Sequence, residues 1–246
     1  MPIFRAILFT AVLAGLIVGV AVSAVQFLGT APLILKAEVY EKAGEAVPAV
    51  ASAAHSQDVH NHDAGMAPHA HEQEHEEGGW EPADGFERNA YTVAANILTA
   101  IGYALALGGL IALRGRPVTW REGLLWGIAG FACVMLAPML GLPPELPGTP
   151  AGPLADRQLW WAGTVAATAA GLGLIAFQRK PWAAAAAVLL IALPHLVGAP
   201  AAPDGDHGLA PQSLERQFVA AAVLTSLVFW SLLGSLTGAL LRRFEA

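Results

Sequence analysis

Six long apolar stretches constrain this chain more than any other feature of its sequence. Each is about long enough to cross a bilayer as a helix, because ~30 Å of hydrocarbon needs ~20 helical residues. They cover residues 5–28, 90–113, 123–140, 159–177, 182–199 and 218–241. The pattern predicts an all-α integral membrane protein with about six transmembrane helices. The fifth stretch is the shortest and contains Pro194, so it is the weakest span.

The composition agrees with a membrane protein. Hydrophobic residues make up 55% and charged residues only 13% of the 246 residues, and the mean hydropathy is +0.53. A soluble domain usually has ~25% charged residues, so a soluble helical protein of this size would have too little polar surface. Cys133 is the one cysteine, which excludes a disulfide framework and a CxxC metal or redox site.

The distribution of Lys and Arg predicts the topology. With the amino terminus in the cytoplasm, the short inner segments hold 8 of the 13 basic residues, as the positive-inside rule requires. The outer segments hold 17 of the 19 acidic residues, an excess that suggests a functional role because acidic residues contribute little to orientation. We expect a multi-pass protein of a bacterial inner membrane with both termini in the cytoplasm.

These spans divide the chain into three parts. Residues 1–35 form the first transmembrane helix, 36–89 a periplasmic loop, and 90–246 a five-helix membrane bundle. The first stretch also resembles a signal peptide with a passable cleavage site after Ala24. Its apolar run continues through Leu35, which favours a retained helix.

Three similar phrases suggest an internal repeat. Each outward-running span ends near a proline, at Pro32, Pro138 and Pro194. Each following span opens with an acid, an arginine and an amide, at residues 87–89, 156–158 and 215–217. The pattern is that of three parallel helical hairpins around a pseudo-threefold axis, although Pro and Arg also mark span ends without any repeat. The acid–arginine pairs would form a charged ring at the outer mouth, or only anchor the helices at the interface.

The outer loop has the composition of a metal-binding segment. Six of the eight histidines lie within 21 residues, mixed with Asp and Glu. Imidazole and carboxylate groups bind Co²⁺, Ni²⁺, Zn²⁺ and Cu²⁺, and His-x-His spacing lets two ligands share one ion. With few large apolar residues, the segment should be disordered without metal. The predicted ligands are His55, His60, His62, His69, His71 and His75.

Two further candidates lie inside predicted spans. His195 follows Pro194 in the outer part of the fifth span, and Met139 is its counterpart in the repeat. Ionisable residues at such depth are rare and usually face the interior of a bundle. An imidazole and a thioether around one axis would make a transient metal site. The alternatives are a hydrogen-bonding histidine at a helix end and a methionine that fills the core; Gln26 and Asn96 are weaker polar candidates.

No motif for catalysis is visible. The sequence lacks a phosphate-binding P-loop, HExxH, GxSxG and a paired carboxylate within a span. We therefore expect neither an enzyme nor a nucleic-acid-binding protein. The expected partners are the lipid bilayer and a transition-metal ion.

Several phrases together resemble the CbtA family of bacterial proteins. They are residues 32–41, PLILKAEVYE; 80–85, WEPADG, with the following Glu87 and Arg88; 142–148, LPPELPG; 157–161, RQLWW; and 194–200, PHLVGAP. The resemblance covers nearly the whole chain. It implies a cobalt transporter subunit, usually accompanied by CbtB, a small single-span subunit with its own histidine cluster. Members are usually described with five spans, one fewer than counted here.

Together these observations predict a membrane subunit for Co²⁺ uptake, in which the outer loop captures the metal and the helix bundle conducts it. Ni²⁺ and Zn²⁺ remain alternatives as the metal. A different class of function, a metal-sensing or scaffolding membrane protein that conducts nothing, also fits the pattern, as does a metal tolerance or export subunit.

Overall fold

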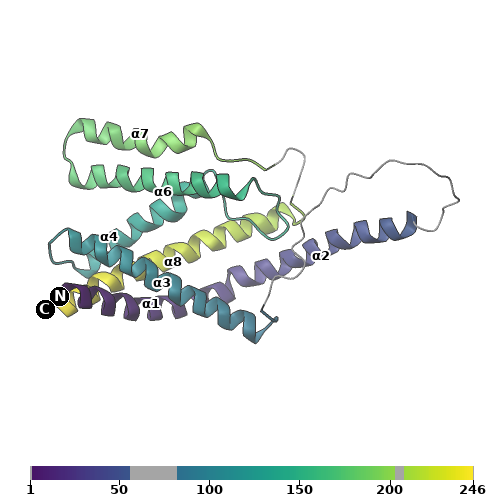
Figure 1. Cartoon of the computed structure of the whole chain (residues 1–246), viewed down its shortest axis with the longest axis horizontal. Helices are drawn as coiled ribbons and strands as arrows, with labels where there is room; N and C mark the ends of the chain where they lie inside the picture. The colour runs from purple at the N-terminus through teal and green to yellow at the C-terminus, as the bar shows by residue number, and fades with distance from the viewer. Residues whose placement is uncertain (1, 56–81, 203–207, 246) are drawn as a thin grey trace, which may run out of the picture.

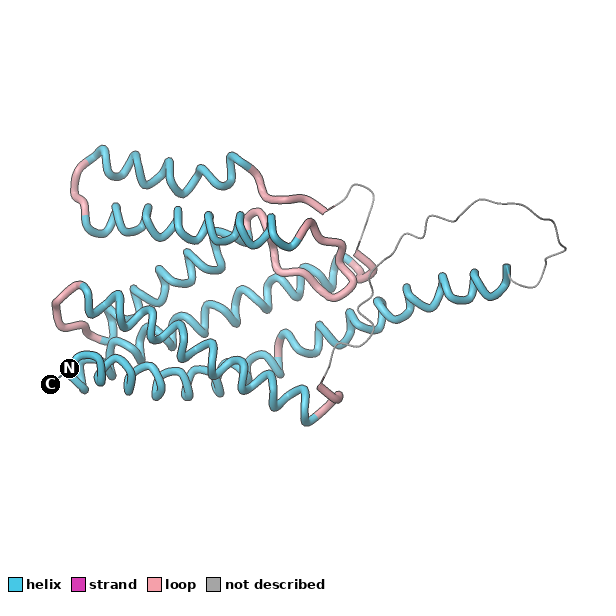
Figure 2. Tube along the Cα trace, viewed as in Figure 1, coloured by secondary structure: helices cyan, strands magenta, loops and turns pink. Residues whose placement is uncertain are grey.

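The computed structural model describes residues 2–55, 82–202 and 208–245, and all regular structure in these ranges is helical (Figures 1 and 2). Five of its helices are long and apolar enough to cross a membrane, which agrees with the predicted all-α membrane fold. In chain order the elements are α1 (Pro2–Leu28), α2 (Thr30–His55), α3 (Phe86–Leu113), α4 (Trp120–Phe131), the π-helix η1 (Ala132–Leu136), α5 (Ala137–Met139), α6 (Leu154–Phe177), α7 (Pro181–Val197) and α8 (Gln212–Glu245).

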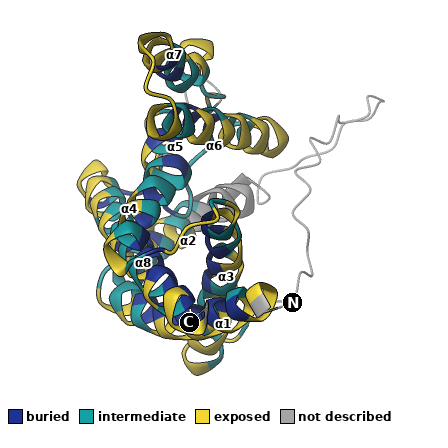
Figure 3. Cartoon of the chain, turned by 90° about the vertical axis from the view of Figure 1, so that its left-hand side faces the viewer, coloured by how far each residue is buried: buried dark blue, intermediate teal, exposed yellow. Residues whose placement is uncertain are grey.

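The main bundle consists of α1, α3, α4 and α8. α1 packs along α3 and α8, and α4 packs along α8. The core between these helices combines small residues such as Ala11, Ala14 and Ala100 with Trp230 and Leu233. α6 and α7 pair with each other and lie to one side of this group (Figures 1 and 3). The three helical hairpins expected from the sequence are therefore not packed alike, and the repeat remains a prediction.

Glycine spacing explains the two closest helix pairs. Gly123 and Gly127 of α4 face Gly234 and Gly238 of α8, with backbone against backbone. Gly15 and Gly19 of α1 lie in the same way against Ile101 and Ile97 of α3. Residues without a Cβ allow such close approach and are typical of membrane helix interfaces. These GxxxG pairs let the helices pack closely together.

Large apolar side chains cover the outward faces of the helices. Leu98, Leu125, Leu159 and Leu224 are each more than 60% exposed, and Figure 3 shows that exposed residues lie on the outside of the bundle. Such a continuous apolar surface is rare on soluble monomers and is what a lipid environment requires.

α7 is shorter than the other spans. It has 17 residues, or about 26 Å of helix at 1.5 Å per residue, near the lower limit for crossing ~30 Å of hydrocarbon. The described part of the chain thus has five long spans and one short apolar helix. The sixth span, at α7, stays a prediction from the sequence.

A π-helical turn interrupts the third span before Pro138. In η1 the hydrogen-bonding pattern widens, and the backbone N–H of Ala137 donates to the carbonyl of Ala132. Proline has no N–H, and its ring would collide with the carbonyl four residues earlier, here that of Val134. The π-helical turn directly before Pro138 is one way for the backbone to accommodate the proline.

α2 differs from the sequence-based expectation. Residues 36–89 were interpreted as a loop, but the helix that resumes after Gly29 continues to His55 and extends beyond the bundle (Figure 1). Many of its residues are Ala, Glu and Lys, which favour helix. The first half of α2 packs in an apolar cluster at the end of the bundle from which α2 extends. The cluster consists of Ala37, Leu146, Ala210 and Leu214.

Candidate metal-handling site

The structure places only part of the predicted metal-binding set. His60, His62, His69, His71 and His75 lie outside the described residues. His55 is the last residue of α2. Met139 is the last residue of α5 and is half-buried. His195 lies in the last turn of α7, directly after Pro194.

His195 packs against a tryptophan from the neighbouring helix. Its ring and the indole of Trp160 on α6 meet edge to face, with 5.7 Å between their centroids. The indole N–H of Trp160 donates a hydrogen bond of 3.1 Å to the carbonyl of Pro194. α6 therefore holds α7 at its proline, beside the histidine.

The same indole also lies against the chain after α5. A Cβ on Gly141 would come within 2.6 Å of the Trp160 ring and 2.9 Å of Ala199. The segments that follow the two proline-containing helix ends, at Pro138 and Pro194, thus meet at one tryptophan. Sequence reasoning did not single out Trp160 for this role; the only signal was its place in the phrase 157–161.

One nitrogen of His195 has no hydrogen-bond partner in the part of the chain that the structure describes. Its Nε2 is buried and accepts or donates no hydrogen bond among the described residues. A buried polar atom without a partner is costly, and a neutral imidazole nitrogen is also a common metal ligand. The structure therefore leaves this nitrogen available for a ligand.

His195 alone is not a complete metal site. The described residues contain no group of three or more His, Cys, Asp or Glu side chains that would hold an ion. Pro194 also removes the α-helical donor from the carbonyl of Leu190, four residues earlier. That carbonyl oxygen is a further donor atom that the local sequence offers.

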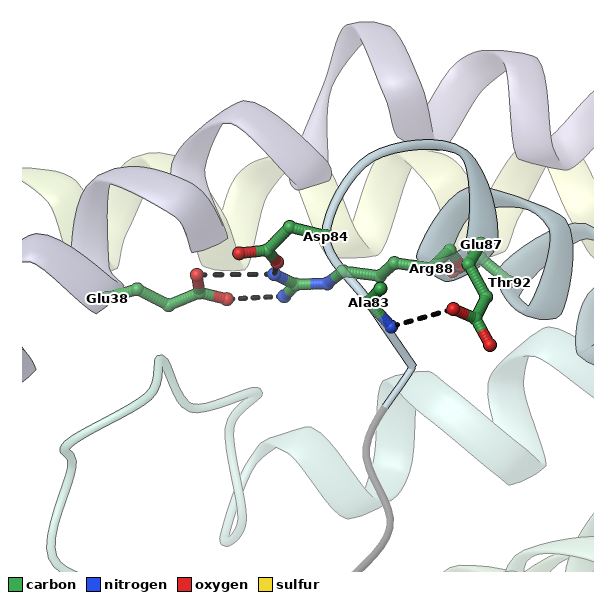
Figure 4. A network of polar contacts seen from close by, with 6 residues as sticks. All are labelled: Glu38, Ala83, Asp84, Glu87, Arg88 and Thr92. Atoms are coloured by element: carbon green, nitrogen blue, oxygen red, sulfur yellow. Dashed lines mark hydrogen bonds and ion pairs between the residues drawn. The ribbon is translucent and has the colours of Figure 1, made fainter.

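Arginines at the outer end form ion pairs that link separate segments. Arg88 of α3 pairs with Glu38 of α2 through both guanidinium Nη atoms and also lies 3.4 Å from Asp84 (Figure 4). Hydrogen bonds from Arg88 lower the pKa of Glu38 below its ordinary value. Glu87, the acid of the repeated phrase, instead accepts a hydrogen bond from the backbone N–H of Ala83.

The second arginine of the repeated phrase behaves in the same way. Arg157 pairs with Glu145 at 2.5 Å. The two glutamates hold similar positions in the chain, because Glu145 lies seven residues after Pro138 and Glu38 lies six residues after Pro32. The third, Arg216, is exposed and contacts the side-chain oxygen of Gln212. In two of the three repeated phrases, the arginine at the start of a helix thus pairs with a glutamate in the segment after the preceding proline. The sequence analysis did not identify these glutamate partners.

The weaker polar candidates satisfy each other. The side-chain amide of Asn96 donates to Ser23 at 2.9 Å and to Gln26 at 2.6 Å. The Ser23 hydroxyl in turn donates to the carbonyl of Gly19. This cluster joins α1 to α3, so we assign it a structural role.

Comparison with protein-family models matches residues 4–242 to the family described as "Probable cobalt transporter subunit (CbtA)". The chain belongs to the CbtA family. Comparison with curated proteins gave no match, and comparison with solved structures also gave none. The expected resemblance is thereby confirmed, and the CbtA assignment makes cobalt the implied transported ion of a multi-pass membrane subunit. Membership of a transporter family also suggests a protein without enzymatic activity.

Proposed function

We propose that this CbtA-family chain is the membrane subunit through which Co²⁺ enters the cell. The observation that carries the proposal is the family match over residues 4–242, in a chain whose outer segment contains six histidines within 21 residues. In this mechanism the segment 55–77 gathers the ion, and the acidic outer surface raises its local concentration. The chain would act with a small single-span, histidine-containing subunit of the CbtB kind.

His195, on α7 at the α6–α7 pair beside the main bundle, is the proposed transfer site. Its Nε2 is buried and has no hydrogen-bond partner among the described residues, and the Trp160 hydrogen bond fixes the backbone next to it. The carbonyl that Pro194 leaves without a donor would supply a second ligand. Few ligands are an advantage in a conducting site, because an ion that is held weakly also leaves quickly.

The path of the chain supports six crossings. Its two ends lie at the same end of the bundle (Figure 1), as an even number of passages would place them, and we propose α7 as the sixth. With the basic loops in the cytoplasm, both termini are inside and α2 projects outward. In this orientation a membrane potential of about 100 mV contributes roughly 4.6 kcal/mol to the entry of a divalent ion.

The deciding experiment measures cell-associated cobalt by elemental mass spectrometry at limiting external cobalt. Cells without other uptake systems would express the intact chain, a deletion of residues 55–77, or His195→Ala, each with the small partner. Leu196→Ala is the matched control, because Leu196 adjoins His195 but is 76% exposed. We expect the deletion to lose uptake at low cobalt and regain it at high cobalt.

We expect His195→Ala to lose uptake at both concentrations, while Leu196→Ala keeps it at equal membrane abundance. The capture step should weaken below about pH 6, where imidazoles become protonated. No uptake above empty cells would refute the import mechanism. A cobalt-dependent response without accumulation would then support sensing, and reduced accumulation would support export.

A further inference from the structure

A groove on the surface of α1 is unrelated to the proposed metal path. This open groove has a volume of about 650 Å³ and lies beside the carboxyl-terminal end of α8. It is lined by Phe9, Leu13 and Leu16 of α1 and by Phe244 of α8. The rings of Phe9 and Phe244 are 6.3 Å apart and form part of its wall. Arg5 is the charged residue that lines it.

The length of the groove matches one leaflet of a bilayer. From Arg5 to Leu16 the helix rises about 16 Å, and half of a ~30 Å hydrocarbon core is ~15 Å. Arg5 lies near the amino-terminal end of α1, at the end of the bundle that holds both chain ends (Figure 1), and only apolar side chains follow it along the groove. An apolar channel of one leaflet's depth with a cation at its mouth has the dimensions of a phospholipid.

The charge at the mouth favours an anionic lipid. Arg5 is exposed and forms no ion pair with any described residue. Arg242 and Arg243 follow in the last turns of α8, where they and Trp120 line a second hollow of about 410 Å³. Basic clusters at the ends of membrane helices attract anionic headgroups.

A transmembrane partner helix fits this groove less well. Such a helix would cross both leaflets and need a continuous groove along α1, which extends to Leu28, whereas the groove ends near Leu16. Free phosphate has no apolar part that could contact the apolar wall of the groove. We propose that this groove binds one anionic phospholipid, with its phosphate at Arg5 and an acyl chain along Phe9, Leu13 and Leu16.

The test compares lipid binding by the purified full-length chain in detergent, by native mass spectrometry and thermal stability. The probes are phosphatidylglycerol and phosphatidylethanolamine with identical acyl chains, and inorganic phosphate alone. We expect phosphatidylglycerol to bind in preference and to raise the melting temperature, while phosphate alone does neither. Equal binding of both lipids, or equal stabilisation by phosphate, would overturn the proposal.

Two variants locate the site. Arg5→Gln should weaken phosphatidylglycerol binding about fivefold, the factor that corresponds to ~1 kcal/mol per surface cation. Leu13→Trp should fill the groove and reduce binding while keeping the charge, so the test survives if Arg5→Gln does not fold. Arg179→Gln is the control, since Arg179 is an exposed cation that lines neither hollow. An equal loss in Arg179→Gln would indicate unspecific attraction and reject the site. Because binding is measured without transport, the result is independent of the proposed cobalt path.

Discussion

The contact between α4 and α8 predicts that a single added methyl group is severe at Gly127. A Cβ at this position would lie 2.1 Å from the backbone carbonyl oxygen of Trp230 and 3.1 Å from the Cα of Gly234. Ordinary van der Waals contact begins near 3.4 Å, so the two helices would have to separate by about 1.3 Å along that line. Backbone atoms of two packed helices cannot move aside as a flexible side chain does.

The magnitude follows from this separation. A gap of 0.5–1 Å already removes about a quarter to a half of a dispersion contact, and overpacking a close-packed interface costs about 1–3 kcal/mol. The loss of glycine from a helix offsets up to about 1 kcal/mol of this cost. For a chain of this size, 1 kcal/mol shifts the melting temperature by about 2–4 °C. Because the clash is with backbone atoms, we take the upper end of this cost, which leaves a net loss of about 2 kcal/mol. We expect Gly127→Ala to melt about 4–8 °C below the wild-type protein.

Cys133 provides a built-in assay. It is the one cysteine of the chain and is buried in the described structure, so a thiol-reactive fluorophore reports unfolding as the temperature rises. Helical circular dichroism in the same detergent distinguishes global melting from local opening near Cys133. Gly102→Ala is the matched control, because nothing lies within 4 Å of a Cβ at this position in α3.

The control should melt at or slightly above the wild-type temperature. If the melting temperatures of Gly127→Ala and Gly102→Ala both lie within about 2 °C of the wild-type value, then α4 and α8 do not approach each other as closely as described at Gly127. A fall of equal size in both variants would instead indicate a general intolerance of alanine at helical glycines. Either result would contradict the packing argument.

Two further predictions concern the polar contacts at the outer end. Glu38→Gln should remove an ion pair with Arg88 and lower stability by about 0.2–1 kcal/mol, since both groups are partly exposed. Because Arg88 lowers the pKa of Glu38 below its ordinary 4.5, the pair stabilises the folded protein above that pH and loses its effect as the pH falls through the lowered value. Melting curves of wild type and variant should therefore converge in acid; a difference that persists there would disprove the assignment. Trp160→Phe should cost about 1 kcal/mol by removing the hydrogen bond to the Pro194 carbonyl, whereas Trp161→Phe should have little effect; equal melting of the two variants would argue against that bond.

The apolar stretches and glycine spacing could be interpreted from the sequence because they act locally. A helix of about 20 apolar residues satisfies its own backbone groups in lipid, so its length and composition predict a span without knowledge of its neighbours. The same holds for Gly123 and Gly127, whose spacing predicts close approach to some helix. It does not predict which helix, because every membrane helix offers an apolar face.

The extent of α2 was missed for a related reason. Composition assigned residues 36–55 to the histidine-rich segment that follows, and few large apolar residues argued against structure. Helix-forming residues and contacts with Leu146 and Leu214, far along the chain, favour order instead. A segment that is anchored by distant residues is not recognised from its own composition.

The sequence by itself determined the helical membrane class, most span boundaries and the residue types available for binding a metal. Only the tertiary structure decided that α4 packs on α8, that Arg88 and Arg157 pair with Glu38 and Glu145, and that Trp160 lies between the ends of two proline-containing segments. The physical reason is that these contacts join residues whose partners depend on how whole helices are arranged. Periodicity and local propensity carry no information about that arrangement.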